Sequence, residues 1–167
     1  MDLFFLKYDL REEMKKNIYN WQEILFALNN QIVTVEDVIE YASYIINENI
    51  MGFNIVLEMT CLHGDEDIYP YLQQLIMLED SQNIADIKEK WLYLILKWLY
   101  EKRNSIENAL EIVEEIYEIF DYPDSITSFV RYMPSEAGNL GSVELNRERL
   151  FENWANYLKL FEEEHLS

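Results

Sequence analysis

The chain has 167 residues, half of them apolar, with 12 Tyr, 8 Phe and 4 Trp, so it can bury a hydrophobic core and is not intrinsically disordered. Its 32 acidic residues exceed its 13 Lys and Arg and give a net charge of −19. This charge repels phosphate groups, which excludes nucleic acids and anionic membranes as electrostatic partners and favours a basic protein.

Cysteine usage and hydropathy predict a cytoplasmic protein. The single Cys61 cannot form an internal disulfide. The apolar run near the amino terminus is too short for a secretion signal, and Asp2 precedes it. The most apolar segment, 91–100, is far shorter than the roughly 18 residues of a membrane span and contains Lys97. We therefore expect no export signal and no membrane-spanning helix.

Capping boxes predict the first two helices. In this pattern a cap side chain accepts a hydrogen bond from an amide of the first turn, and an acidic side chain three residues later accepts one from the cap amide. Asn20 with Glu23, and Thr34 with Asp37, have this spacing. Apolar residues then recur at intervals of three and four, which predicts helices over 20–29 and 34–47.

The stretch CLHGDEDIYPYL, residues 61–72, combines a cysteine, a histidine and three acids. A helix is predicted over 51–62, and Gly64 stands where a left-handed residue would close it. Asp65 or Asp67 can cap the next helix, and Pro70 fits its first turn because the amide that proline lacks would have no partner there. We interpret the stretch as a capped turn between two helices.

Two other interpretations of this turn remain open. Asp65, Glu66 and Asp67 could form an acidic contact surface, and His63 with two of these acids could offer one nitrogen and two oxygens to a metal ion. No second His or Cys stands at ligand spacing, since His165 lies in the C-terminal tail. The capped turn is favoured, and no metal or other cofactor is predicted.

Four further helices are predicted after this turn. They are expected over 84–103 behind Asn83, 106–120 behind Ser105, 125–132 behind Asp124 and 143–164 behind Ser142, with a loop over 133–141.

The helix over 84–103 is apolar nearly all round, which indicates a central position in the fold. The residues expected to be buried there are Trp91, Leu94, Ile95, Trp98 and Leu99. Together the spacings predict an all-α protein with one helical domain over 1–167. It would be a bundle or a short irregular solenoid of antiparallel helical hairpins.

The sequence offers no enzyme. It has no Gly-rich phosphate loop, no HExxH and no paired CxxC. A nucleophilic triad would have to be built around His63, and Cys61 is two residues away on a helix, a spacing that points the two side chains apart. Acidic pairs are so numerous that no single pair can be chosen for acid–base catalysis.

An acidic stripe accompanies the helix over 106–120. Its predicted buried face consists of Leu110, Val113, Ile116, Tyr117 and Phe120, and its other side of Glu111, Glu114, Glu115 and Glu118. The pairs 111/115 and 114/118 repel by about 0.2–0.5 kcal/mol each, and no Lys or Arg lies between Arg103 and Arg131 to relieve them. The stripe is either a solvated face that keeps the protein soluble or a docking face for a cationic partner.

Three segments carry a family resemblance: NWQEILFALNNQIVTVEDVIEYASYII (20–46), YPDSITSFVRYMP (122–134) and ELNRERLFENWANYLKLF (144–161). They resemble a family of small bacterial proteins, domain of unknown function 2247, while the middle of the chain, 50–110, is similar only as generic helix. The resemblance implies an immunity-type protein, encoded beside a secreted toxin of competing bacteria. It implies no functional residues.

Three functions follow as hypotheses. The first is a non-enzymatic, acidic immunity protein that neutralises a basic toxin domain by protein–protein contact. The second is an adaptor or scaffold module with an unrelated protein partner, and the third is a metal-dependent enzyme with carboxylate ligands. A toxin gene immediately upstream would favour the first, and metal analysis would identify the third. The candidate partner-binding residues are Glu111, Glu114, Glu115, Glu118, Asp65, Glu66 and Asp67.

Overall fold

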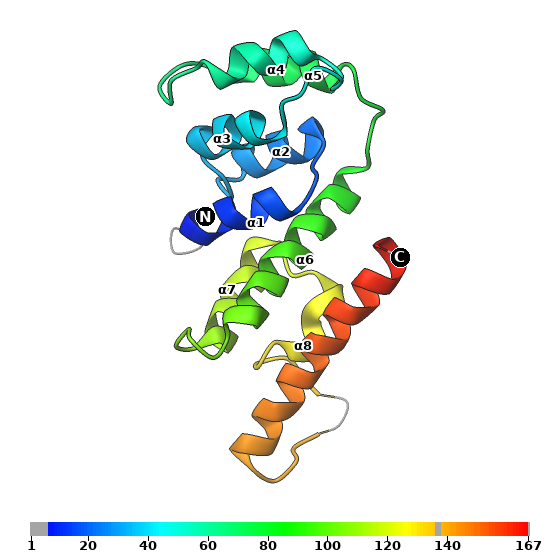
Figure 1. Cartoon of the computed structure of the whole chain (residues 1–167). Coiled ribbons are helices and arrows are strands. Elements are labelled where there is room, and N and C mark those ends of the chain that lie inside the picture. Colours follow the sequence, from blue (N-terminus) through cyan, green and yellow to red (C-terminus); the bar gives the residue numbers. More distant parts are fainter. Residues whose placement is uncertain (1–6, 136–137, 167) are drawn as a thin grey trace. The chain divides into compact units, whose positions relative to one another are not determined.

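The computed structural model describes residues 7–135 and 138–166, and every regular element in these ranges is a helix (Figure 1). The predicted all-α class is therefore confirmed. The α-helices are α1 (Lys7–Lys16), α2 (Trp21–Asn29), α3 (Val35–Ile45), α4 (Phe53–Thr60), α5 (Tyr69–Ile76), α6 (Ile84–Lys102), α7 (Ala109–Ile119) and α8 (Val143–His165), and η2 (Asp124–Phe129) is a 3₁₀ helix.

The chain divides into two compact units, one ending at Lys88 and one beginning at Glu89, so the boundary falls within α6. The division into compact units does not test the prediction of one domain over 1–167, which stays a prediction.

In the first unit, α3 packs against α4 and α1, and α2 packs against α5 (Figure 1). Tyr19, Trp21 and Tyr41 form a buried aromatic cluster in this unit. The Tyr19 amide donates to the Tyr41 hydroxyl at 2.9 Å, and that hydroxyl lies 3.2 Å from the Tyr19 carbonyl. Tyr41 also meets the rings of Tyr19 and Trp21 edge to face. Burial raises the pKa of both tyrosines, so they remain neutral and can keep these hydrogen bonds.

Both predicted capping boxes are present. Asn20 Oδ1 accepts from the Glu23 amide at 3.1 Å, and the Glu23 carboxylate accepts from the Asn20 amide at 3.2 Å. At α3 the Asp37 carboxylate accepts from the Thr34 amide at 2.8 Å, and Thr34 Oγ1 accepts from the Asp37 amide at 3.2 Å. Both acids are almost fully buried, with 5% and 4% of their surface exposed. Backbone amides thus satisfy the two buried carboxylates.

A third carboxylate reaches the start of α2 from the segment after α5. Glu79 accepts hydrogen bonds from the Trp21 and Gln22 amides. The Gln22 side chain in turn donates to the Asp80 carbonyl at 2.7 Å and accepts from the Gln82 amide at 3.0 Å. A negative charge at a helix N-terminus meets both free amides and the positive end of the helix dipole. This contact fastens residues 79–82 to α2.

Around α6 the prediction of burial is confirmed. Trp91, Ile95, Trp98 and Leu99 are each at most 3% exposed, and Leu94 is half-buried. In the second unit, α8 and η2 pack closely. The buried Trp154 of α8 stacks on Phe129 of η2 and meets Tyr100 of α6 edge to face, with ring centroids 5.8 and 5.2 Å apart.

Polar contacts also join α6 to α8. The Tyr93 ring stacks on Phe161 at 4.2 Å between centroids, and its hydroxyl donates to Glu162 at 2.7 Å. Lys97 lies 3.2 Å from the same carboxylate. Burial, followed by the bond to Glu162, raises the pKa of Tyr93 to about 12. The Tyr93 hydroxyl, and then Lys97, lower the pKa of Glu162.

Three elements differ from the prediction, because helix α1 (Lys7–Lys16) was not predicted, helix α7 begins later and the segment after it is a 3₁₀ helix. Helix α7 begins at Ala109 behind Asn108, which is left-handed (φ 61°), and Ser105 instead donates to the Lys102 carbonyl at the end of α6. The segment predicted as an α-helix over 125–132 is the 3₁₀ helix η2. Residues 136 and 137 of the predicted loop over 133–141 lie outside the described residues.

Replacing Glu79 with Ala is expected to lower the free energy of unfolding by about 1–2 kcal/mol, because two amides at the start of α2 lose a charged acceptor. Asp80→Ala is the matched control, since Asp80 takes part in this contact through its backbone carbonyl. Its cost should stay below about 0.5 kcal/mol. Urea unfolding followed by circular dichroism makes the comparison. Equal losses in the two variants would contradict the assigned role of Glu79.

Candidate functional site

Helix α7 has the two sides that its sequence predicts. Leu110, Val113, Ile116, Tyr117 and Phe120 are all buried. On the other side Glu111, Glu115 and Glu118 are exposed, and Glu114 is half-buried. The structure therefore places the four predicted acids along one accessible side of one helix.

Arg131 changes the expected charge of this side. Its Nε and Nη2 atoms donate to the two Glu114 oxygens at 2.6 and 3.0 Å, and its Nη1 atom lies 3.6 Å from Glu111. The Glu114 hydrogen bonds are the main reason that the pKa of the Arg131 guanidinium is raised. The expectation that no cation relieves the stripe is wrong, because the fold brings Arg131 back onto α7 from 17 residues beyond Glu114.

Glu115 and Glu118 keep their charge unpaired. Neither forms an ion pair within the part of the chain that the structure describes. The four acids were predicted as one set. In the structure Arg131 holds Glu111 and Glu114, whereas Glu115 and Glu118 face solvent. Carboxylates without an internal partner are the ones available to a cation from outside.

Two exposed tyrosines lie beside these acids. Tyr122 and Tyr132 are 55% and 53% exposed. Their rings pack against buried Tyr117 of α7, with centroids 5.2 and 6.1 Å away. The pKa of Tyr132 is raised, first by desolvation and then by the Glu118 charge. We call Glu111, Glu114, Glu115, Glu118, Tyr122 and Tyr132 the acidic-aromatic face.

The backbone that presents Tyr122 is strained. Asp121 and Tyr122 both have left-handed conformations, with φ of 62° and 56°. A bulky residue in this region costs roughly 1–2 kcal/mol. Such strain is concentrated at functional sites in proteins. Here it turns the chain after α7 so that a large apolar ring lies half in solvent beside the acids.

Tyr122 and Tyr132 were not among the candidate residues predicted from the sequence. Both lie in YPDSITSFVRYMP, residues 122–134, one of the three segments that carry the family resemblance. The signal available in the sequence was a tyrosine shortly before a proline at each end of that segment. Tyr122 follows α7 directly, whereas the packing of Tyr132 on Tyr117 depends on the return of the chain past η2, which local periodicity does not reveal.

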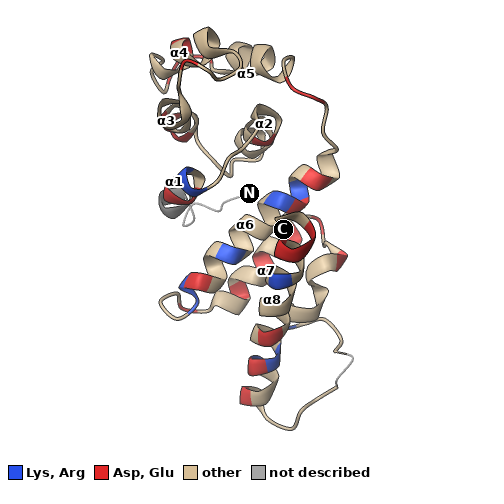
Figure 2. Ribbon diagram, turned by 45° about the vertical axis from the view of Figure 1, so that its right-hand side comes forward, with Lys and Arg blue, Asp and Glu red and all other residues tan. Residues whose placement is uncertain are grey.

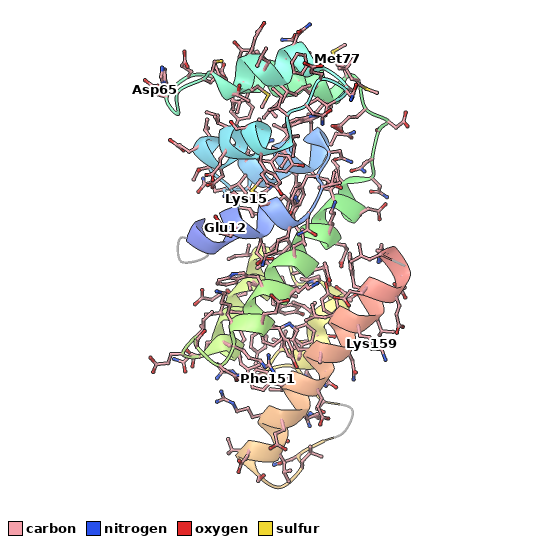
Figure 3. The ribbon with its side chains drawn as sticks, in the orientation of Figure 1. Glu12, Lys15, Asp65, Met77, Phe151 and Lys159 are labelled. Carbon is pink, nitrogen blue, oxygen red and sulfur yellow. The ribbon has the colours of Figure 1, made fainter. Side chains whose placement is uncertain are left out.

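The second predicted set lies in the turn between α4 and α5. Asp65, Glu66 and Asp67 are all exposed, and Figure 3 shows Asp65 at the tip of the turn. Glu66 accepts from the His63 amide at 2.5 Å, and Asp67 accepts from the Tyr69 amide at 3.0 Å. Pro70 occupies the first turn of α5, as predicted. Two of these acids therefore serve the backbone of the turn.

Gly64 has a different role from the one predicted. Its φ is not left-handed, and the Glu36 carboxylate of α3, the movable end of a flexible side chain, lies where a Cβ would stand. The left-handed glycine of this region is Gly52, before α4, with φ of 73°. Among the residues that the structure describes, no group of three or more His, Cys, Asp or Glu is arranged to hold a metal ion.

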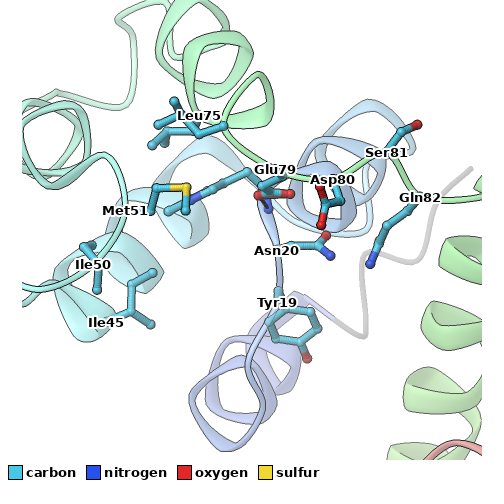
Figure 4. A pocket seen from close by; sticks show the side chains of 12 residues that line it. Tyr19, Asn20, Ile45, Ile50, Met51, Leu75, Glu79, Asp80, Ser81 and Gln82 are labelled. Atoms are coloured by element: carbon cyan, nitrogen blue, oxygen red, sulfur yellow. Dashed lines mark hydrogen bonds between the residues drawn. The ribbon is translucent and has the colours of Figure 1, made fainter.

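The first unit also contains a groove of about 620 Å³ with apolar and polar lining residues. Figure 4 shows Met51, Leu75 and Glu79 around it, and Met51 and Leu78 leave 67% and 45% of their surface exposed. The lining comes from segments as far apart as Tyr19 and Gln82. Sequence patterns could not identify this groove because its parts meet only after folding.

Comparison with known protein families places the chain in one of them. Residues 12–162 match the model of a family described as "Uncharacterized protein conserved in bacteria (DUF2247)". The chain belongs to this family, and the predicted membership is confirmed. No curated protein and no solved structure shows significant similarity to it. Within the described ranges, none of the helices has the length and hydropathy needed to span a membrane.

The division of the four acids can be tested by single substitutions. Glu114→Gln should lower the free energy of unfolding by about 0.5–1 kcal/mol, because the bidentate ion pair between Glu114 and Arg131 is replaced by a hydrogen bond to a neutral amide. Glu118→Gln, the matched control on the same helix, should be neutral or stabilising by about 0.2–0.5 kcal/mol, since it removes a repulsion. Chemical denaturation of both variants decides the matter. A Glu118→Gln variant as unstable as Glu114→Gln would show that the stripe acts as one unit.

Proposed function

We propose that this protein is a non-catalytic binding protein that neutralises a basic bacterial toxin domain by direct contact through the acidic-aromatic face. The observation that carries the proposal is the combination, on one face, of two unpaired carboxylates with two exposed tyrosine rings. The net charge of −19 and the bacterial family membership agree with such a role.

Each component of the face has a distinct physical part in binding a cationic surface. Glu115 and Glu118 would attract the partner over distance and pair with its Lys or Arg side chains. The rings of Tyr122 and Tyr132 offer a large apolar area, a hydroxyl and an electron-rich surface for cation–π contact with the same cations. Tyrosine is among the residues that contribute most to binding energy at interfaces.

Arg131 gives the face a fixed shape. By holding Glu114 and Glu111 it orders one end of the stripe before any partner arrives. Ordered side chains lose less entropy on binding, so affinity is gained without new contacts. The paired acids would border the interface, and Glu115 and Glu118 would lie at its centre.

The proposal is tested by identifying a toxin gene beside the gene for this protein and expressing its basic C-terminal domain, with and without this protein, in a sensitive host. We expect growth to be restored by the wild type. In stopped-flow association, Glu115→Gln with Glu118→Gln should slow binding about three- to tenfold at low ionic strength and much less at high salt. Tyr122→Ala with Tyr132→Ala should chiefly speed dissociation, by about tenfold.

Glu101→Gln with Glu107→Gln is the matched control, because it removes two exposed charges that lie in neither predicted set. If this control slowed association by the same factor, the effect would be due to net charge alone. The acidic-aromatic face would then not be the interface. Unchanged rates in the Glu115/Glu118 variant, with slowing on replacement of Asp65, Glu66 and Asp67, would move the interface to the turn between α4 and α5. Failure to restore growth would favour an adaptor with an unrelated partner.

A further inference from the structure

The second unit contains a cavity that is lined by several of the chain's arginines. The chain has five arginines, and Arg131, Arg147 and Arg149 all line one cavity of about 410 Å³. Asn139, Asn146 and Leu150 contribute to the same lining. In a protein with so few cations, three guanidinium groups at one cavity are a concentration that the overall composition does not explain.

The three arginines differ in how their charge is balanced. Arg131 is engaged by Glu114. Arg147 and Arg149 form no ion pair with any described residue. Acids are available on the same helix, since Glu144 and Glu152 lie three positions from Arg147 and Arg149, respectively, and Figure 2 shows both signs of charge at this end of α8. Neither guanidinium is paired with a described carboxylate, although Glu111 also lines the cavity and Arg147 lies 5.5 Å from the centroid of the Phe151 ring.

Arg149 provides the most direct sign of a missing partner. Its Nη1 atom donates to the Gly138 carbonyl at 2.7 Å, which anchors the guanidinium. Its Nε atom is buried and has no hydrogen-bond partner within the described part of the chain. A buried donor left unsatisfied costs roughly 1–3 kcal/mol, more when the group is charged.

The rest of the lining is ordered and mixed in character. Asn146 donates to Asn139 at 3.1 Å and to the Ser142 carbonyl at 2.8 Å, and it accepts from the Leu140 amide at 3.1 Å. These bonds connect the loop to the first turn of α8. Leu150 supplies a nearly buried apolar surface, with 8% exposed. Small-molecule sites typically combine such apolar walls with a few fixed polar groups, in volumes of about 300–1,000 Å³.

We propose that this cavity binds a small organic molecule with an oxyanion group, either a carboxylate or a phosphate. The anionic group bonds to Arg149 and Arg147, whose planar guanidinium groups match two oxygens at once. The apolar part of the molecule rests on Leu150. The inference does not depend on a toxin partner, because it concerns a ligand of the opposite charge.

The test is nuclear magnetic resonance titration of the full chain, followed at the Arg149 Nε–H signal. The probes are 3-phenylpropionate and phenyl phosphate, which distinguish the two oxyanions, and 3-phenylpropionamide as a neutral counterpart. We expect one or both anions to shift the Arg149 Nε–H signal downfield in a saturable manner. The amide should bind at least about tenfold more weakly, since it lacks the charged acceptor.

Variants locate the site. Arg149→Lys keeps the charge but loses the planar fork and the Nε–H group, and we expect at least about tenfold weaker binding, with a smaller loss for Arg147→Gln. Arg103→Gln is the control, because Arg103 stacks on Tyr100 and does not line the cavity. Binding that is equal in Arg149→Lys and wild type, equally strong binding of the neutral amide, or no shift with either anion would each overturn the proposal.

Discussion

The shortage of cations is the constraint on which this structure depends, since 32 carboxylates share 13 Lys and Arg. Most acids cannot be neutralised by ion pairs, and the fold satisfies several of them with backbone amides instead. Glu23 and Asp37 close capping boxes, and Glu79 binds the amides at the start of α2. A helix N-terminus offers free N–H groups and a partial positive charge, so each helix start can replace a basic side chain. An all-α fold with many short helices therefore suits a very acidic sequence.

Where a cation is used, it joins segments that are distant in the sequence. Lys15 of α1 pairs with Glu40 of α3 as well as with its neighbour Glu12 (Figure 3). Lys97 meets Glu162 across α6 and α8, and Arg131 returns to α7. Glu115 and Glu118 are among the acids whose carboxylates accept no hydrogen bond and form no ion pair within the described part of the chain. They share their helix with Tyr117, on which the exposed rings of Tyr122 and Tyr132 pack.

Local features of the sequence predicted most of the helical structure. Both capping boxes, the burial of α6 and the two sides of α7 follow from short-range spacing, and the structure confirms them. The start of α7 and the 3₁₀ helix η2 could not be predicted, because a left-handed Asn108 and a strained turn at Asp121 override local preference. The ion pair of Arg131 with Glu114 and the packing of Tyr132 on Tyr117 were also inaccessible, since each requires a contact between segments that only tertiary packing brings together.

The central claim is that a basic partner binds the acidic-aromatic face of the second unit. Hydrogen–deuterium exchange of the protein, alone and saturated with a basic toxin domain whose activity it blocks, tests this claim most directly. We predict that protection on binding is confined to residues 108–134, which include α7, the turn after it and η2. Protection confined to the groove around Met51 and Leu78, or to the turn at 63–67, would contradict the account.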